Sequence, residues 1–358
     1  MSTVNLREEI FSAFAVESVT KRYRLGEVEV TDLREALGTK GHVFVVRGDL
    51  ALADQLPCPE LASPKMWVYE ELVRSERIQE ALKSYPDYRL FDGVGFFGLE
   101  ALGFHATRLG RGALAVMARE FIPDPALFKR WNIEVINGDG LAEEGYIKKQ
   151  AEILASRKDL IPFHQALYGA KALAPVGNAV ADIIADRCHL DFTFWCVAGG
   201  SNLYGIGGKI KQHFPHVKTV VVEPEMQMTI GPDVDPHDSV EVRRYVKSRL
   251  KGSLLTDWDQ TSSGLFPLHV ASPNRYLLHL WNFTGDMGFD ELMPVRVDSS
   301  VATQHLLKEV NQEWDWTKTT ALALTPAIEE ARKGSNVLVV SYGKNREHQY
   351  KHVRVAVP

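Results

Sequence analysis

The sequence predicts an α/β fold with mainly parallel sheets, divided into two domains. Strand-like and helix-like segments alternate along most of the chain, which is typical of parallel sheets joined by right-handed helical crossovers. With 358 residues, the chain also exceeds the length at which one hydrophobic core usually splits into two. Hydrophobic residues make up 45% of the chain, so it can bury two cores of ordinary globular composition.

Predicted strands and helices alternate through the first half of the chain. Apolar runs predict strands at 42–50, 113–120 and 133–138, and a strand that enters a glycine-rich turn at 89–98. Helices are predicted between these strands at 66–82, where apolar residues recur at three- and four-residue steps, and at 99–110, 125–132 and 143–156.

The second half continues the pattern. It contains a β-turn-α-β unit, with strands predicted at 192–197 and 218–224 and a helix at 210–214. A last helix is predicted at 326–334 and a last strand at 336–343. The segment 228–275 is irregular, so we expect a loop-rich surface flap or entrance there.

Charge and hydropathy exclude several classes of partner. The net charge is −5 and basic residues are scattered, so we expect no nucleic-acid partner. No apolar run reaches the roughly 18 residues that a membrane span needs, and the polar segment 1–14 does not resemble a secretory signal. We therefore expect a cytoplasmic protein with no membrane partner.

Neither the cysteines nor the acidic residues predict a metal site. The three cysteines, Cys58, Cys188 and Cys196, lack metal-ligand spacing, which is typical of a reducing cytosol. One loop is oxygen-rich enough for a divalent cation, and its residues are Asp233, Asp235, His237 and Asp238. We expect this loop to be a solvated acidic segment and predict no metal.

The turn after the strand at 192–197 has the composition of an anion site. It contains, in order, Gly199, Gly200, Ser201 and Asn202. Backbone N–H groups in such a turn, at the positive end of a helix dipole, can bind a phosphate together. Glycine permits close approach of the anion and tolerates positive φ. We therefore predict a phosphate-containing cofactor here, against the alternative that the glycines serve turn geometry alone.

One hypothesis for that cofactor is a nicotinamide or flavin dinucleotide. Glu223 ends the next strand, about where such folds place the partner of a ribose hydroxyl. The glycines of this segment, however, do not form the G-x-G-x-x-G pattern directly after the strand. They lie at positions 199, 200, 205, 207 and 208.

The other hypothesis is pyridoxal phosphate, because three segments resemble one family. CVAGGSNLYGIG (196–207), followed by VVVEPE (220–225), resembles the phosphate loop and next strand of the fold-type II pyridoxal-phosphate enzymes, which include the tryptophan synthase β-subunit and cysteine synthase. GVGFFG (93–98) resembles their substrate-carboxylate loop. The segment 325–348 resembles the helix, strand and loop near the pyridine nitrogen. The resemblance covers roughly residues 40–350, with the three segments in the family's order.

This resemblance implies two three-layer α/β/α domains with mainly parallel sheets, and pyridoxal 5'-phosphate in the cleft between them. Residues 40–165 would form the smaller domain, with the cofactor lysine and the carboxylate loop. Residues 1–39 and 166–358 would form the larger domain, with the phosphate loop. The resemblance also implies a small-molecule amino-acid substrate and a homodimer.

The resemblance places the lysine that holds the cofactor as a Schiff base at the start of a helix upstream of the carboxylate loop. The segment ASPKMWVYEEL puts Lys65 at that place, directly after Pro64. Burial suits a lysine to this task, because it lowers the amine's pKa and leaves the amine free to attack an aldehyde. The same amine can then move the α-proton of the substrate.

The resemblance also assigns the substrate carboxylate to backbone N–H groups of the loop after Asp92. Its residues are Gly93, Val94, Gly95, Phe96, Phe97 and Gly98. Asp92 either caps the helix that follows this loop or transfers a proton, and we favour the cap. Phe91 stands where tryptophan synthase carries the Glu that helps to activate indole, so we do not expect tryptophan as the product.

The remaining cofactor contacts follow from the same resemblance. The turn 199–202 would bind the phosphate, and Glu223 would lie beside the cofactor. The partner of the pyridine nitrogen is left open between four residues, Ser341, Tyr342, Thr319 and Thr320.

The implied reaction is β-elimination or β-replacement on a serine- or cysteine-like amino acid, through an aminoacrylate intermediate. Two other classes of function remain as alternatives. One is an NAD(P)-dependent oxidoreductase, based on the β-turn-α-β unit and Glu223. The other is a non-catalytic relative that keeps the fold as a binding subunit, based on the altered carboxylate loop.

Overall fold

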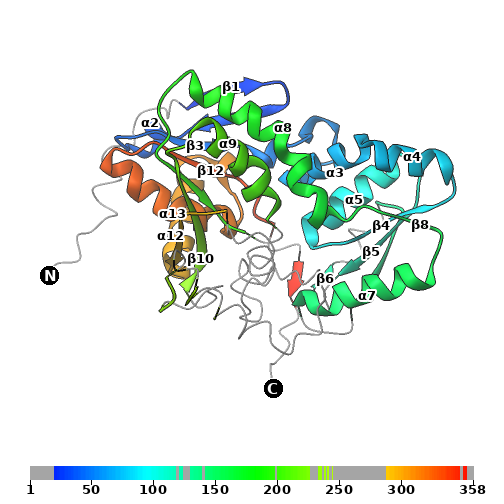
Figure 1. The fold of residues 1–358 in the computed structure, drawn as a ribbon. Coiled ribbons are helices and arrows are strands. Elements are labelled where there is room, and N and C mark those ends of the chain that lie inside the picture. The colour runs from blue at the N-terminus through cyan, green and yellow to red at the C-terminus, as the bar shows by residue number, and fades with distance from the viewer. Residues whose placement is uncertain are drawn as a thin grey trace.

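Two β-sheets, each covered by helices, make up the protein in a computed structural model (Figure 1). Each sheet belongs to one half of the molecule. The residues that the structure describes are 20–117, 121–123, 130–138, 142–197, 200–225, 233–235, 238, 240–241, 244, 288–346 and 350–352.

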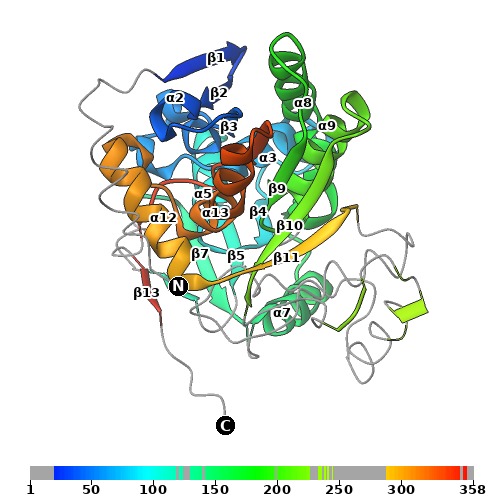
Figure 2. The same ribbon diagram turned by 90° about the vertical axis from the view of Figure 1, so that its left-hand side faces the viewer.

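The larger sheet has seven strands in the order β1-β2-β3-β12-β9-β10-β11. Its antiparallel edge consists of β1, β2 and β3, and all pairs from β3 to β11 are parallel. Figure 2 shows β1 at one edge of this sheet and β11 at the other. The strands are β1 (Lys21–Leu25), β2 (Val28–Asp32), β3 (Val43–Val46), β9 (Phe192–Trp195), β10 (Lys218–Pro224), β11 (Glu291–Val295) and β12 (Val337–Val340).

The smaller sheet has four strands in the order β7-β5-β4-β8, and all of its pairs are parallel. Its strands are β4 (Arg89–Gly93), β5 (Ala113–Met117), β7 (Ile133–Asn137) and β8 (Leu160–Pro162). A separate antiparallel pair joins β6 (Phe121–Pro123) to β13 (Tyr350–His352), so the C-terminal segment crosses to the half that contains the smaller sheet.

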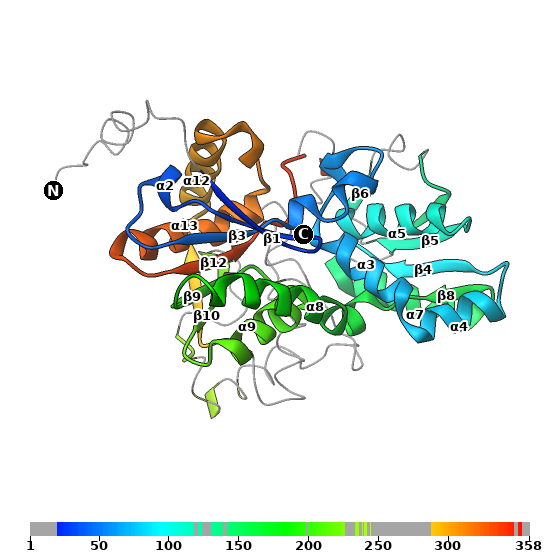
Figure 3. The same ribbon diagram turned by 90° about the horizontal axis from the view of Figure 1, so that it is seen from above.

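Helices cover both faces of each sheet. Figure 3 shows α12 and α13 on one side of the seven-stranded sheet and α8 and α9 on the other, and Figure 1 shows α4 and α5 above the smaller sheet with α7 below it. The helices are α2 (Arg34–Leu37), α3 (Pro64–Arg74), α4 (Glu76–Ser84), α5 (Phe96–Arg108), α7 (Ala142–Ser156), α8 (Gln165–Ala185), α9 (Gly208–His213), α12 (Val297–Val310) and α13 (Lys318–Lys333).

The central strands are buried on both faces, which explains their unbroken apolar sequences. All four residues of β3 and all four of β12 are buried. Side chains alternate across a strand, so Val43 and Val45 pack in the cluster that contains the inner side of α13. Phe44 and Val46 pack in the cluster that contains α3 and α8. Sheets covered on both faces have this near-continuous hydrophobic pattern. The predicted α/β fold with mainly parallel sheets is confirmed.

Two predicted boundaries differ from the structure. The helix predicted at 66–82 is two helices, because Ser75 has an extended backbone with ψ of 142° and separates α3 from α4. The domain boundary predicted at residue 40 precedes β3, whereas β3 pairs with β12 in the larger sheet and the smaller sheet begins at β4. Most of the predicted helix 125–132 and of the irregular segment 228–275 lies outside the described residues.

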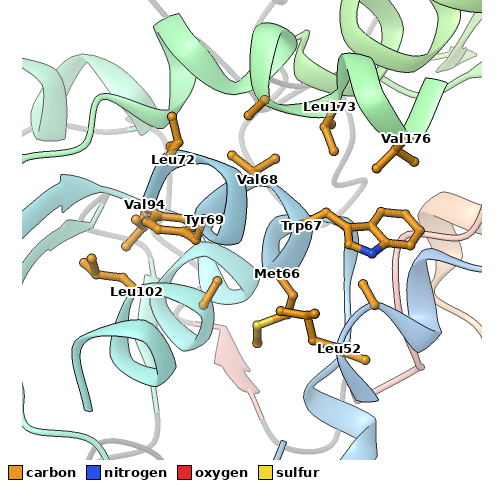
Figure 4. Close-up of a cluster of buried hydrophobic side chains, with 14 of the residues drawn as sticks. Leu52, Met66, Trp67, Val68, Tyr69, Leu72, Val94, Leu102, Leu173 and Val176 are labelled. Atoms are coloured by element: carbon orange, nitrogen blue, oxygen red, sulfur yellow. The ribbon is translucent and has the colours of Figure 1, made fainter. Parts of the chain in front are cut away.

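A buried cluster joins α8 to the smaller half of the molecule through α3. Figure 4 shows Leu173 and Val176 of α8 above Val68 and Trp67 of α3. The other side of α3 packs against α5, and all of these side chains belong to one core. The α8 helix therefore runs from the larger sheet to the start of α3.

A buried ion pair ties the segment after β12 to α5. The guanidinium of Arg346 donates to both carboxylate oxygens of Glu100, at 2.7 and 2.5 Å, and both side chains are almost fully buried. The same guanidinium lies 5.3 Å from the centre of the Phe97 ring. This pair connects the end of the chain to the helix that follows the predicted carboxylate loop.

Replacing Glu100 with Gln is expected to destabilise the protein by about 3–5 kcal/mol, because the buried Arg346 guanidinium would lose the carboxylate that accepts two of its hydrogen bonds. The double variant Glu100→Leu/Arg346→Met removes both charges and should recover most of that loss. Urea unfolding followed by circular dichroism measures both. A loss below about 1 kcal/mol for Glu100→Gln would contradict the expectation.

Candidate active site

Lys65 lies at the second position of α3, where the sequence places it. Pro64 is the first residue of this helix, a position at which proline's missing N–H is tolerated. The ε-amine donates a hydrogen bond to Oε1 of Gln165. Burial lowers the pKa of the amine from 10.5 to about 8, although the nearby Asp92 carboxylate opposes this effect. A substantial fraction of the amine is therefore neutral at mildly alkaline pH.

Asp92 lies near the C-terminal end of β4 and is buried there. Its Oδ2 accepts hydrogen bonds from the Tyr69 hydroxyl at 2.8 Å and from the backbone N–H of Gln165 at 3.1 Å, and its Oδ1 accepts from the backbone N–H of Gly93 at 2.9 Å. Burial raises the pKa of this carboxyl to about 6, against the lowering effect of these donors and of Lys65.

The expectation that Asp92 caps the helix after its loop is wrong. Gly95 occupies the N-cap of α5, and no side chain caps that helix. Asp92 instead binds the first backbone N–H of α8, which begins at Gln165. A parallel strand such as β8 brings α8 to the same edge of the sheet, so the carboxylate can serve a helix that is remote in sequence.

The predicted carboxylate loop forms the first turn of α5. Phe96, Phe97 and Gly98 are the first three residues of this helix, whose first backbone N–H groups have no partner inside the helix. A Cβ on Gly93 would displace the side-chain amide of Gln150, which packs against this glycine. The uncapped N-terminus, beside a glycine backbone, can bind a small carboxylate.

The predicted phosphate turn also leads into a helix. Gly200 has φ of 77°, which glycine adopts readily, and helical backbone runs from Ser201 through the π-helical turn η4 (Leu203–Gly207) into α9. Ser201 Oγ and Asn202 Oδ1 are buried without a hydrogen-bond partner among the described residues. The Asn amide, turned over, presents a donor instead. Gly199 lies outside the described residues.

The first turns of α8 connect these two regions. Gln165 contacts Lys65, Asp92 and Gly93. One helical turn later, a Cβ on Gly169 would lie only 2.4 Å from Ser201 Oγ, so α8 passes directly beside the phosphate turn. Four residues of helix rise about 6 Å. The Lys65 amine and the Ser201 hydroxyl therefore lie beside the same short stretch of α8.

The four candidates for a ring-nitrogen partner differ in how their hydroxyls are engaged. Ser341 donates to Asp49 at 2.5 Å, and Tyr342 donates to the backbone carbonyl of Cys196 at 2.8 Å. The Thr320 hydroxyl accepts from the Tyr342 backbone N–H at 2.9 Å. The Thr319 hydroxyl has no hydrogen bond to any part of the chain that the structure describes. Among the described residues, Thr319 is therefore the candidate whose hydroxyl is not engaged by another group of the chain.

Glu223 and Phe91 lie within buried strands, Glu223 near the end of β10 and Phe91 in the middle of β4. Glu223 is fully buried in β10, where its charge, together with burial, raises the pKa of the Cys196 thiol. A fully buried side chain is not accessible to the ribose of a dinucleotide, which binds at the open end of the sheet. Phe91 is buried in β4 and belongs to the hydrophobic core.

Gln165 is the functional residue that sequence reasoning missed. Nothing local distinguishes it, because its partners come from α3 and from β4. The sequence carried no signal for it. The structure does carry one, because His164, directly before it, has φ of 52°, a left-handed conformation that is uncommon for a residue other than glycine and that often marks functional sites.

Three features bear on metal and membrane binding. Across the described ranges, no group of three or more His, Cys, Asp and Glu side chains could hold a metal ion. In the acidic loop, Asp233, Asp235 and Asp238 are described and His237 is not. Within the same ranges, no helix has the length and apolarity needed to cross a membrane.

Solved structures share the fold of this chain. One is the O-acetylserine dependent cystathionine beta-synthase of Helicobacter pylori, with 14% identity, a TM-score of 0.60, and 99% of this chain and 100% of that chain covered. Another is a hydrogen sulfide-producing enzyme of Fusobacterium nucleatum, with 15% identity, a TM-score of 0.58, and 97% and 99% covered. The sequence matches no protein-family model and no curated protein.

The predicted resemblance to the fold-type II pyridoxal-phosphate enzymes is confirmed for the fold, which both solved structures share over nearly the whole chain. Because the identities are low, the likeness is one of fold, and the chemistry of this chain has to be argued from its own residues.

Lys65 is expected to react with cyanate with a midpoint near pH 8, because only the neutral amine is nucleophilic and burial lowers its pKa to about 8. Short pulses between pH 6 and 11, followed by peptide mass spectrometry, measure the profile. Lys333 is the internal control, since Glu330 raises its pKa above 10.5. Equal midpoints for Lys65 and Lys333 would contradict this description of the site.

Proposed function

We propose that the protein is a pyridoxal-phosphate-dependent enzyme that eliminates or replaces a group on the β-carbon of a serine- or cysteine-like amino acid. The observation that carries this proposal is the buried Lys65 amine with its lowered pKa, placed beside Asp92. A buried lysine without a full ion-pair geometry is costly and is typical of a reactive amine rather than of a structural one. This favours a catalytic protein over a binding subunit.

Two further observations support the choice of cofactor. The buried, unpartnered oxygens of Ser201 and Asn202 lie at a helix N-terminus, where a phosphate is well bound. Two of the solved structures that share this fold have titles that name an O-acetylserine dependent synthase and a hydrogen sulfide-producing enzyme, in agreement with the resemblance to pyridoxal-phosphate enzymes in the sequence. Both titles fit substrates with a displaceable group on the β-carbon.

Lys65 and Asp92 would carry out the proton transfer of this reaction. When bound, pyridoxal phosphate supplies an electron sink for negative charge at the substrate α-carbon. Lys65 would hold the cofactor through its ε-amine and, once released, accept the α-proton. The Asp92 carboxylate would stabilise the ammonium that this transfer creates, because opposite charges favour each other strongly in a buried site. The lysine could then return the proton to the leaving group.

The two helix N-termini would bind the anionic groups. Ser201 and Asn202 would donate to the cofactor phosphate together with the first amides of their helix. The uncapped N-terminus of α5 would bind the substrate carboxylate and orient its α-carbon toward Lys65. Thr319, with its unoccupied hydroxyl, is our candidate for the pyridine nitrogen. Phe91 lies in the core and carries no carboxylate, so it cannot assist an indole substrate.

Borohydride reduction in the presence of pyridoxal phosphate is expected to leave a stable pyridoxyl group on Lys65, which tryptic mass spectrometry would locate. The Lys65→Arg variant keeps the positive charge and should carry no adduct. Lys333→Arg is the matched control at an exposed lysine and should label at Lys65 as the unaltered chain does. An adduct elsewhere, or none, would overturn the proposed function.

Ser201→Ala and Asn202→Ala are each expected to weaken pyridoxal phosphate binding about tenfold, because each removes a hydrogen bond to a charged group. Binding of pyridoxal, which lacks the phosphate, should remain unchanged. Absorbance titrations with the two compounds give the ratio of affinities.

Ser63→Ala is the control for this pair of variants. Ser63 Oγ is also buried without a partner among the described residues, but it lies beside Lys65 and not in the phosphate turn. The Ser63 variant should keep the ratio of the two affinities. If Ser201→Ala and Asn202→Ala also keep it, the phosphate does not bind at this turn.

A further inference from the structure

One glutamine joins the amine to the predicted carboxylate loop. The side chain of Gln165 accepts a hydrogen bond from the Lys65 amine through Oε1 and donates to the backbone carbonyl of Gly93 through Nε2, at 3.5 Å. Its backbone N–H donates to Asp92 at 3.1 Å. Three groups from α3 and β4 are therefore held by a single residue, which is itself 9% exposed.

An amide is the group that this position requires. The Lys65 amine needs an acceptor, and the Gly93 carbonyl needs a donor; a glutamine side chain supplies both. A carboxylate could accept from the amine but could not donate to the carbonyl. It would also add a negative charge, which would keep the lysine protonated and therefore unreactive.

The backbone holds Gln165 in place under strain. His164, directly before it, has φ of 52° and ψ of 51°, and a left-handed conformation is unfavourable for a residue with a side chain. The hydrogen bond from the Gln165 backbone to Asp92 holds this turn against the end of β4. Strained backbone next to an ordered polar network is typical of functional sites.

We infer that Gln165 is a positioning residue, which holds the free ε-amine of Lys65 and couples it to the 93–98 loop. This inference deepens the proposed function and relies on it for the meaning of the loop. Gln165 would hold the ε-amine of Lys65 whenever it is not bound to a cofactor, without adding a charge to it. Binding of a carboxylate at the 93–98 loop would then affect the position of the Lys65 amine, through the hydrogen bond between Gln165 and the Gly93 carbonyl.

The charges around Lys65 make the inference testable by titration. Among the described residues, the charged group that acts on this amine is Asp92 of β4, to which Tyr69 of α3 donates its hydroxyl. Gln165 is the first residue of α8 and is neutral. Variants at Gln165 therefore change the surroundings of the amine without removing its one opposite charge.

The experiment is the pH profile of Lys65 cyanate labelling in the full chain, cleared of bound carbonyl compounds with hydroxylamine. Gln165→Glu places a second carboxylate on the amine and should raise the midpoint by about one pH unit or more. Gln165→Leu keeps the volume but removes an acceptor of the ammonium, so the midpoint should fall by about one pH unit. A purely structural residue would shift both variants in the same direction, or neither.

Gln150→Leu is the matched control. Gln150 contacts Gly93 from α7, on the same loop, and no hydrogen bond joins it to Lys65 among the described residues. Its variant should keep the midpoint of the unaltered chain. Equal midpoints in the two Gln165 variants, or an equal fall in Gln150→Leu and Gln165→Leu, would overturn the positioning role.

The outcome is separable from that of the proposed function. Cyanate labelling needs no cofactor, whereas borohydride trapping at Lys65 needs one. If the Gln165 variants shift the midpoints as expected but no pyridoxyl group is found, the positioning role stands and the cofactor proposal fails. If trapping succeeds and the midpoints do not move, the cofactor proposal stands and the role of Gln165 fails.

Discussion

The site depends on a buried amine and a buried carboxylate that are kept close to each other by an amide. Lys65, Asp92 and Gln165 come from α3, β4 and α8, so their contact requires three elements to end or begin at one place. Water is largely excluded there, which strengthens electrostatic interactions and makes each unmatched charge costly. The positions of the carboxylate loop and of the first turn of α8 follow from this one arrangement.

Parallel sheets explain why such remote residues meet. The strands from β3 to β11 of the larger sheet run the same way, as do the four strands of the smaller sheet. The loops that leave their carboxyl ends therefore gather at one edge, where α/β proteins bind ligands. Asp92 and Gly93 lie at the end of β4, the phosphate turn follows β9, and Ser341 follows β12. The α8 helix then brings the edge of the smaller sheet to that of the larger one, because Gln165 contacts the first and Gly169 lies against Ser201 of the second.

The sequence was informative where a local pattern decides the structure. The apolar runs of β3 and β12 identified central strands, and the turns before α5 and α9 identified helix N-termini. The α8 helix was missed, because Pro175 and two glycines argue against a helix of 21 residues. Tertiary contacts outweigh that local cost. A Cβ on Gly177 would lie 2.8 Å from the Gly205 carbonyl, so the glycines let two helical segments approach each other closely. Gln165 could not be predicted, since its role exists only where α3, β4 and α8 meet.

The linkage between protonation and folding fits the proposed role of this pair in the site and not a role in stability. Burial raises the pKa of Asp92 from 3.8 to about 6, so folding favours its protonated form and loses stability as pH rises from 3.8 to about 6. Burial lowers the pKa of Lys65 from 10.5 to about 8, so the cost of its buried charge is present below about 8 and is relieved as pH rises toward 10.5. Both groups therefore cost stability most between about pH 6 and 8. A pair retained for structure would show the opposite shifts, as Arg47 does when it lowers the pKa of the buried Asp49 carboxyl. At neutral pH the chain thus keeps two buried charges that lower the stability of its fold. This arrangement provides an amine that gives up its proton readily.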